Sequence, residues 1–345
     1  MSMPSIRHQQ GLALVSVLFI TALVVALITA ISHRQWLDIQ LTSNLVFRTQ
    51  AFHYVKSAEL LATQGLYLDW DIAQKSNEPL VDDYKEQTFT HKLLFPIENN
   101  QGAVEAELFD LQGLFNLNGL VDSNNKVIPA KLEQLKRLIA QVATNNNLQI
   151  PSDIAESMAD WIDEDNSPTG LGHEEGDYLV YSPAYRTPNY FFSSVDELML
   201  MEGIQKEPVL FDVLSPFFSA LPERATQLNV NTIPREVILS LDSKITESDV
   251  DTLIADREKL DEGYKDVNTF LQHQAFAGVT GNLDANDFTV ATSFFLLKSR
   301  VFLGDRVVQA YSVLFRDPAD GKTRVISRDL SKRYIPDPNK PLFTF

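Results

Sequence analysis

The chain opens with an uninterrupted apolar segment. The twenty residues from Leu12 to Ile31 contain no charged residue and no proline, and the only formal charge in the short stretch before them is Arg7. A helix of about 20 apolar residues, rising ~1.5 Å per residue, is long enough to cross the ~30 Å hydrocarbon core of a bilayer. The pattern therefore predicts a transmembrane helix over residues 12–32.

Helical spacing of apolar residues continues beyond this segment. The positions three or four residues apart are Leu37, Leu41, Leu45, Phe52, Val55, Ala62 and Leu66, and the charged residues off that line are Arg34, Asp38, Arg48, Lys56 and Glu59. Such a pattern is typical of an amphipathic helix that carries a folded domain on one side. We expect one continuous helix from Leu12 to about Gln64, with Gly65 as its stop signal, and assign residues 12–66 to it.

Three interpretations of the N-terminus compete. A secretory signal peptide cleaved after Ala30 would have an apolar stretch of only ~7–15 residues. A plain membrane anchor would keep the whole N-terminus. A prepilin leader, residues 1–11, would be cleaved after Gly11 and would leave Leu12 as the first mature residue. The amphipathic continuation of the helix favours the third interpretation.

Alternating apolar residues predict strands in two separate regions. In the first region, residues 87–110, the alternating positions are Phe89, Leu93, Phe95, Val104, Ala106 and Leu108, with a turn at 99–102. The second region has two runs of alternating apolar residues: Phe295, Leu297, Val301 and Leu303, and then Val307, Tyr311, Val313 and Phe315. A turn at Gly304–Asp305 separates the two runs, and a turn at Asp320–Gly321 precedes a last strand at 324–328. Period-two alternation with short turns predicts an antiparallel sheet.

Between the two strand regions lies an insert with helical spacing. Its apolar positions include Leu132, Leu135, Leu138, Ile139 and Val142, followed by Ile154, Met158 and Trp161. The predicted fold class is α+β: a long N-terminal helix packed on a small antiparallel sheet, with a large all-helical domain inserted between the strands. Residues 67–128 and 287–345 form the α/β domain, and residues 129–286 form the inserted helical domain.

Composition excludes several kinds of function. The formal net charge is −17, with 46 acidic and 29 basic residues, so nucleic acid is not an expected partner. Residues 228–241 resemble the start of a helix-hairpin-helix unit, but the acidic residues that follow favour a packing role over DNA contact. No cysteine is present, which excludes disulfides and thiol catalysis. The sequence contains no catalytic motif with its required spacing, so we expect a protein without enzymatic activity.

An acidic stretch in the insert indicates a metal site. Asp163, Asp165, Ser167 and Glu174 occupy positions 1, 3, 5 and 12 of a calcium-loop spacing, but Pro168 replaces the glycine of an EF-hand. Further ligand candidates are Asp160, Glu175 and Asp177. A solvated acidic loop that caps a helix explains the same residues, and spacing alone does not choose between the two. A zinc site is disfavoured because His173 has no second histidine beside it.

Several motifs resemble one known family. The N-terminal helix looks like that of type IV pilins and pseudopilins. The stretches DWIDEDNSP (160–168), PAYRTPNYFFSSVDELMLMEGI (183–204) and LNVNT (228–232), together with Gly172, Glu174, Asp177 and Tyr178, resemble the general secretion pathway protein K family, the minor pseudopilins of type II secretion. Most pilins have glutamate at the fifth mature position, where this chain has Ser16. A subunit without that buried carboxylate suits the end of a filament.

The resemblance implies specific properties. It implies a pilin-like α/β domain, one or two structural calcium ions, and Asp163, Asp165, Glu174 and Asp177 as the matching ligand positions. It also implies a place at the tip of a periplasmic pseudopilus that starts assembly and helps folded proteins cross the outer membrane. The mature terminus would be methylated, and the location would be a single pass through a Gram-negative inner membrane with the soluble region in the periplasm.

The implied partners are the I and J minor pseudopilins with H below them, the prepilin peptidase and the inner-membrane assembly platform. Exported substrate or the outer-membrane secretin are further candidates. Two alternatives remain open at this stage. One is a minor pilin of a type IV pilus, and the other is a membrane-anchored periplasmic calcium-binding protein or enzyme.

Overall fold

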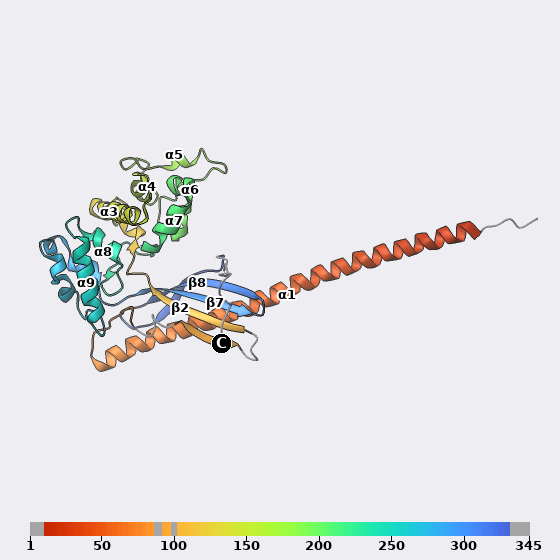
Figure 1. Cartoon of the computed structure of the whole chain (residues 1–345), viewed down its shortest axis with the longest axis horizontal. Helices are drawn as coiled ribbons and strands as arrows, with labels where there is room; N and C mark the ends of the chain where they lie inside the picture. Colours follow the sequence, from red (N-terminus) through yellow and green to blue (C-terminus); the bar gives the residue numbers. More distant parts are fainter. Residues whose placement is uncertain (1–9, 86–91, 98–101, 332–345) are drawn as a thin grey trace, which may run out of the picture.

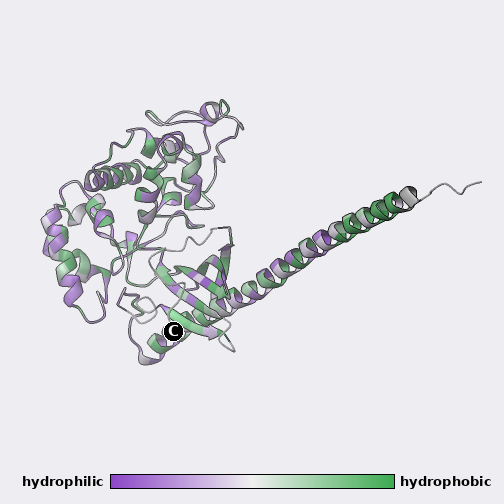
Figure 2. Ribbon diagram, turned by 45° about the vertical axis from the view of Figure 1, so that its right-hand side comes forward, coloured by the Kyte–Doolittle hydropathy of each residue, from purple (hydrophilic) through white to green (hydrophobic). Residues whose placement is uncertain are grey.

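A computed structural model of the chain describes residues 10–85, 92–97 and 102–331. One long helix, α1 (Gln10–Ser76), has 67 residues and is therefore about 100 Å long. Its first half projects away from the rest of the molecule, while its second half lies against a sheet (Figure 1). Hydrophobic residues dominate the projecting end, and polar and apolar residues mix farther along (Figure 2). The predicted leader, residues 1–11, lies mostly outside the described residues.

The predicted stop at Gly65 is wrong, because α1 continues through it to Ser76. A glycine inside a helix costs only about 1 kcal/mol relative to alanine, and tertiary packing just beyond it outweighs that cost. Leu66 is 1% exposed, and the indole of Trp70 lies so close to Gly321 that a Cβ there would meet Trp70 Cδ2 at 2.4 Å. The residue that follows the helix is Asn77, whose left-handed φ of 57° is typical of a C-terminal cap.

The sheet confirms the antiparallel prediction. Its five strands have the order β1-β2-β7-β8-β9, and every neighbouring pair is antiparallel. The strands are β1 (Leu93–Ile97), β2 (Gly102–Asp110), β7 (Phe294–Leu303), β8 (Arg306–Arg316) and β9 (Thr323–Asp329). The predicted turn at Gly304–Asp305 joins β7 to β8, and Gly304 adopts a φ of 59° there. Phe89 and most of the turn predicted at 99–102 lie outside the described residues.

Small residues let α1 lie close to the sheet. Ala51, Val55 and Ala58 are almost fully buried and share a core with alternate residues of β2, β7 and β8. Glu59, expected on the polar side of the helix, is also buried: its carboxylate accepts hydrogen bonds from Ser312 Oγ at 2.6 Å and from Arg328 Nε at 2.6 Å. This ion pair attaches the edge strand β9 to α1.

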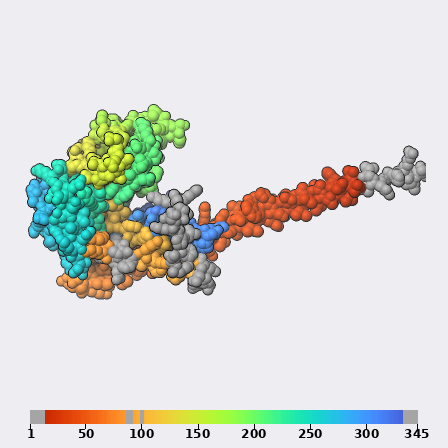
Figure 3. Space-filling view, in the orientation of Figure 1, coloured from red at the N-terminus to blue at the C-terminus, as the bar shows by residue number. Residues whose placement is uncertain are grey.

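The helical lobe is inserted between β2 and β7. Its α-helices are α3 (Pro129–Asn146), α4 (Ile154–Asp160), α5 (Glu175–Tyr178), α6 (Glu202–Lys206), α7 (Val209–Leu214), α8 (Arg235–Leu241), α9 (Glu247–Lys259) and α10 (Val267–Leu271). Two parallel pairs of very short strands add to it: β3 (Phe115–Asn116) with β4 (Phe218–Ser219), and β5 (Leu228–Asn229) with β6 (Phe288–Thr289). The space-filling view shows the lobe bulging to one side of the helix and sheet (Figure 3).

The lobe has its own hydrophobic core. Predicted apolar positions of α3, including Leu135, Leu138 and Val142, are fully buried in it. The same core also takes in Phe115 and Phe288, which lie outside the predicted bounds of the insert at 129 and 286. The core of the lobe therefore begins where β2 ends and closes just before β7 begins.

Candidate functional site

The predicted acidic residues converge at the end of α4. One carboxylate oxygen each from Asp163, Asp165 and Glu174 all lie within 4.8 Å of one another. Asp163 and Glu174 are buried, being 3% and 5% exposed, whereas Asp165 is exposed. The loop after α4 supplies the two aspartates, and Glu174 is the residue before α5. A partly open cluster of three carboxylates results.

Asp160 completes the inner side of this cluster. It is fully buried at the end of α4, and its Oδ1 accepts a hydrogen bond from the Thr169 backbone N–H at 2.9 Å. Gly172 makes room for it, because a Cβ at that position would lie 2.0 Å from Asp160 Oδ2. Gly170, with a φ of 62°, lets the loop turn above Glu156. Both glycines are thus required by the fold of the loop.

Four buried oxygens of the cluster have no hydrogen-bond partner among the described residues: Asp160 Oδ2, Asp163 Oδ1 and both carboxylate oxygens of Glu174. Burial and neighbouring carboxylates raise the pKa values of these groups, to about 6 for Asp160 and to about 7 for Asp163 and Glu174. Buried carboxylates without a counter-charge are costly unless they are protonated or bind a cation. The donor set is all oxygen and suits a hard cation such as calcium.

The other candidate ligands have partners outside the cluster. Asp177 Oδ2 accepts the backbone N–H of Glu174 at 2.9 Å and so caps the first turn of α5. Glu175 forms an ion pair with Arg186 at 3.2 Å. Asp177 therefore holds Glu174 in position, and Glu175 is engaged on the surface. Whether either one contacts an ion stays a prediction.

His173 contacts residues outside the cluster. Its Nδ1 lies 2.9 Å from Ser157 Oγ, and its Nε2 lies 3.1 Å from a carboxylate oxygen of Glu202. Both ring nitrogens therefore have neighbours outside the three-carboxylate group. This arrangement fits an oxygen-ligand site better than a zinc site.

A cluster of aromatic side chains packs next to the acidic loop. Trp161 follows directly after α4, stacks on Phe192 and meets Tyr178 edge to face with ring centroids 5.4 Å apart. Its indole N–H donates to Glu197 Oε2 at 3.0 Å. These contacts join the acidic loop to the 183–204 segment, so both stretches singled out in the sequence belong to one structural unit.

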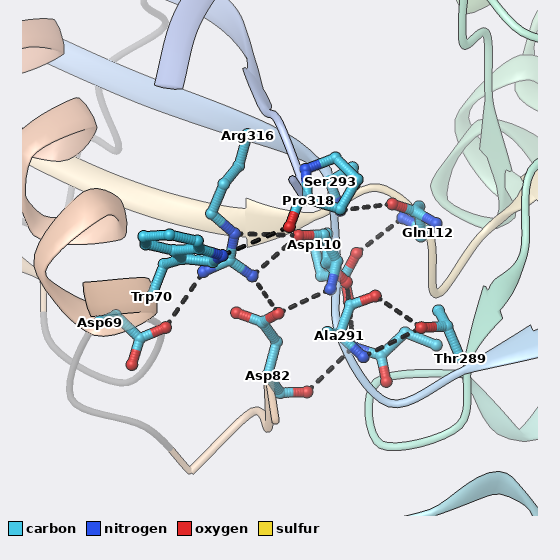
Figure 4. Close-up of polar contacts among 12 residues, drawn as sticks. Asp69, Trp70, Asp82, Asp110, Gln112, Thr289, Ala291, Ser293, Arg316 and Pro318 are labelled. Atoms are coloured by element: carbon cyan, nitrogen blue, oxygen red, sulfur yellow. Dashed lines mark hydrogen bonds and ion pairs between the residues drawn. The ribbon is translucent and has the colours of Figure 1, made fainter. Parts of the chain in front are cut away.

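A second buried polar cluster lies where the lobe meets the helix and sheet (Figure 4). Arg316, 1% exposed at the end of β8, donates to Asp69 of α1 at 3.0 Å and pairs with the buried Asp82. The same guanidinium donates to the backbone oxygen of Thr292 at 2.8 Å and 3.2 Å. Burial raises the pKa of Asp82 to about 7, while Arg316 acts in the opposite direction.

The LNVNT stretch belongs to this junction. Asn229 donates its side-chain N–H groups to the backbone oxygen of Asp82 at 2.9 Å and to Asp110 Oδ2 at 2.8 Å. Asp110 Oδ2 also accepts the hydroxyls of Thr232 at 2.5 Å and Thr292 at 2.6 Å. From sequence alone, only a packing role within the helical lobe is predicted for this stretch. Its two asparagines were the available signal, because buried amides need partners on more than one segment.

The projecting half of α1 is long and apolar enough to cross a membrane, and none of its most hydrophobic stretch is buried against the rest of the described chain. Farther along, Leu37, Leu41 and Leu45 of the predicted apolar line are 42%, 67% and 66% exposed. The predicted stripe therefore divides into two parts. Its C-terminal part contacts the sheet, and its middle part is uncovered in the single chain.

Comparisons with known proteins agree with this architecture. Two family models, both described as "Type II secretion system (T2SS), protein K", match residues 113–223 and 228–291. The type II secretion system protein K of Pseudomonas aeruginosa is 33% identical over 96% of each chain. That of Aeromonas hydrophila is 28% identical over 91% of this chain and 95% of its own.

A solved structure is also similar. It is titled as the GspK-GspI-GspJ complex from the type 2 secretion system of enterotoxigenic Escherichia coli. The matching chain superposes with a TM-score of 0.71 at 25% identity, covering 85% of this chain and 99% of the other. The fold-class prediction is thereby confirmed, and the alternative of a type IV pilus minor pilin is not favoured. The apolar helix is compatible with membrane anchoring of such a protein.

Three findings indicate the same family: family models that match more than half of the chain, a relative matched along almost its whole length, and a shared three-dimensional fold. The chain belongs to the type II secretion system protein K family, the K-type minor pseudopilins, which are structural proteins rather than enzymes.

Proposed function

We propose that this pseudopilin occupies the tip of a periplasmic pseudopilus and starts its assembly with I- and J-type minor pseudopilins, with H below them. The observation that carries the proposal is the similarity of 85% of the chain to a protein solved as a GspK-GspI-GspJ complex. The role is one of assembly and not of catalysis. By helping the pseudopilus form, it would help folded proteins cross the outer membrane, in contact with secretin or exported substrate.

The shape of the lobe supports a terminal position. Pilin-type subunits pack through parallel N-terminal helices, and a subunit that repeats along the rod needs room for its neighbours above and below. Here the lobe stands to one side of the C-terminal half of α1 and extends well beyond the sheet (Figures 1 and 3). A subunit with such a lobe fits at an end, where nothing packs above it.

The uncovered stripe on α1 is the surface we assign to partner helices. Leu37, Leu41 and Leu45 are four residues apart, so they lie on one face over about 12 Å of helix. Contiguous exposed apolar residues on a helix that leaves the membrane mark a protein interface. Ser16 at the fifth mature position agrees with an end subunit, since no glutamate is present there for a neighbouring amine.

Maturation follows from the same assignment. We propose that the prepilin peptidase cleaves after Gly11, that Leu12 becomes the methylated first residue, and that α1 then anchors the chain in the inner membrane with the lobe in the periplasm. The assembly platform would extract the helix into the pseudopilus. Mass spectrometry of the mature chain should find methylated Leu12, whereas an intact leader or a start at Ile31 would contradict this route.

The acidic cluster is proposed to hold one or two structural calcium ions. Asp163, Asp165 and Glu174 would supply side-chain oxygens, with Asp160 directly behind them. The support is the set of buried oxygens without partners, together with the raised pKa values of Asp163 and Glu174, which burial and neighbouring carboxylates cause. A bound ion would neutralise the loop and hold α4 and α5 together, which is a stabilising and not a catalytic role.

The assembly proposal is tested by co-expressing the full chain with candidate I and J partners and separating the detergent extract by size exclusion. We expect a discrete heterotrimer. Leu41→Glu should abolish or strongly weaken it by placing a charge on the uncovered stripe. Val209→Glu, a similar change at a 44% exposed position on α7, is the matched control and should leave the complex intact. A chain that elutes alone in every case would overturn the proposal.

A further inference from the structure

A pocket of about 320 Å³ lies where α1 ends, and no step of the proposed function uses it. The last turns of α1 contribute Asp69 and Ser76, and the connection after the helix contributes Glu78 and Asp83. A loop of the lobe closes the other side with residues 261, 262 and 265. This end of α1 is the one remote from the apolar half, at about 70 Å from Ile31 (Figure 1).

The lining of the pocket has a net negative charge, although Asp69 is paired with Arg316 and Glu262 with Lys265. Five carboxylates and two lysines line it: Asp69, Glu78, Asp83, Asp261 and Glu262, with Lys85 and Lys265. Two helices also end beside it, α1 at Ser76 and α9 at Lys259, and the carbonyl end of a helix carries a partial negative charge. In the described part of the chain, Glu78 and Asp261 form no ion pair.

Lys265 forms an ion pair with Glu262 at 2.8 Å, and two other cations near the pocket, Lys85 and Arg257, are engaged by backbone oxygens. The ammonium of Lys85 donates to the carbonyls of Glu258 at 2.5 Å and Leu260 at 2.7 Å, at the end of α9. The guanidinium of Arg257 donates to the carbonyls of Val230 at 3.1 Å and Ile233 at 3.0 Å. These contacts hold Lys85 in the pocket wall and Arg257 near Asp83.

Asp83 is the group that points to a ligand. It lines the pocket, is only 1% exposed, and its Oδ1 accepts the Lys85 backbone N–H at 3.2 Å. Its Oδ2 is buried without a hydrogen-bond partner among the described residues. Burial raises its pKa, although Lys85 and Arg257 both oppose that shift. A buried carboxylate oxygen at the side of an acidic pocket needs a donor.

The spacing of the carboxylates decides which cation fits. Among the described residues, Asp163, Asp165 and Glu174 form the group of three carboxylates that is compact enough to hold a metal ion. The carboxylates of the pocket at the end of α1 do not form such a group. Carboxylates spread around a volume of about 320 Å³ suit an extended cation that carries its own apolar stem. Ile72 and Ala73 of α1 offer apolar wall for that stem.

We propose that this pocket receives an arginine or lysine side chain of another protein, with Asp83 Oδ2 as the acceptor at its inner end and Glu78 and Asp261 at its mouth. The surface lies beneath the lobe and far from the uncovered stripe on α1. The interaction is therefore separate from the packing of partner helices, and its failure would leave the tip assignment untouched.

The test is fluorescence anisotropy with the full chain in detergent, in saturating calcium at low salt. The probe is a fluorescein-labelled, acetylated and amidated peptide of five glycines and two arginines. Its control is the same peptide with citrulline in place of arginine, which keeps the shape and removes the charge. We expect saturable binding of the arginine peptide, at least tenfold weaker binding of the citrulline peptide, and loss of affinity at high salt.

Variants locate the binding. Asp83→Asn should weaken it at least tenfold, and the exposed pair Glu78→Gln with Asp261→Asn should do the same without disturbing the core. The matched control is Asp212→Asn with Glu223→Gln, which removes the same two kinds of charge from exposed positions elsewhere. Unchanged affinity in the first two variants would overturn the proposal. An equal loss of affinity in all three variants would also overturn it, because the peptide would then be attracted by the net charge of the protein and not by the pocket.

Discussion

Two polar clusters in this chain contain buried carboxylates, and the two clusters differ in what can balance the negative charge. At the junction of lobe, helix and sheet, Arg316 places a positive charge between Asp69 and Asp82. In the acidic loop, Asp163, Asp165 and Glu174 come together, and among the described residues none of these three carboxylates forms an ion pair. A buried carboxylate needs a counter-charge or a proton. The junction carries its counter-charge in the sequence, whereas we propose that the loop takes its counter-charge from solution.

The largest effect is expected from removing the internal counter-charge. Arg316→Met keeps much of the side-chain volume but leaves Asp82 buried and unpaired, so it should lower the free energy of unfolding by about 3–5 kcal/mol. Urea unfolding of the full chain in detergent measures this. Arg324→Met, an exposed arginine on β9, is the control and should change it by less than about 1 kcal/mol. Equal effects of both variants would mean that the junction is not held by Arg316.

Removing the external counter-charge should have the next largest effect. At a calcium concentration 100 times the dissociation constant, the ion stabilises the protein by about 2.7 kcal/mol, and chelation should remove that amount. Asp163→Asn should abolish the calcium response, yet in chelator it should be as stable as the parent chain or more stable, because one repelling charge is gone. Asp212→Asn is the control and should respond to calcium normally. Thermal melts with and without chelator give all these values.

Asn229 tests how far the junction extends beyond its charges. Asn229→Ala removes the side-chain donor to the backbone oxygen of Asp82 and one of the donors to Asp110 Oδ2, which keeps the Thr232 and Thr292 hydroxyls, at a cost of about 1–3 kcal/mol. Limited proteolysis should also show earlier cleavage between lobe and sheet. An unchanged free energy of unfolding would show that the charge pairs alone hold the junction.

A pH dependence should also separate the clusters. The folded-state pKa values of Asp163, Glu174 and Asp82 are raised to about 7, so the native state retains protons that the unfolded state has lost. Stability then decreases as the pH rises from about 5 to about 8. In chelator we expect the melting temperature to fall by several degrees over this range.

Calcium should reduce that fall without removing it, because Asp82 belongs to the other cluster and does not respond to the ion. A melting temperature that rises with pH in chelator would contradict the assignment of raised pKa values to the loop. The same slope with and without calcium would show that the loop does not contribute.

The sequence predicted the elements of the fold better than their ends and contacts. Apolar periodicity located the long helix and the antiparallel strands because tertiary packing agreed with local pattern there. Gly65 misled because local propensity is worth about 1 kcal/mol and the packing of Leu66 outweighs it. In β8 the apolar line at Val307 and Tyr311 was visible, but the face toward α1 includes Ala310 and Ser312, whose small side chains break the pattern.

The acidic loop was predictable because its residues are close in sequence. Asp163 and Glu174 are joined by one short loop, so spacing alone suggested their meeting. The junction was not predictable in this way, since Arg316 and Asp82 are 234 residues apart and nothing in either local sequence indicates the other. Burial of Glu59 was missed for the same reason, because its partners Ser312 and Arg328 lie on strands at the other end of the chain.

The most direct test of the comparison is equilibrium dialysis of radioactive calcium against the chelator-stripped full chain in detergent. We expect the chain to retain about one or two ions, Asp163→Asn to lose them, and Asp212→Asn to keep them. If the stripped chain retained no calcium, or if Asp163→Asn retained as much as the parent, the acidic loop would not be a cation site and the contrast with the junction would fail.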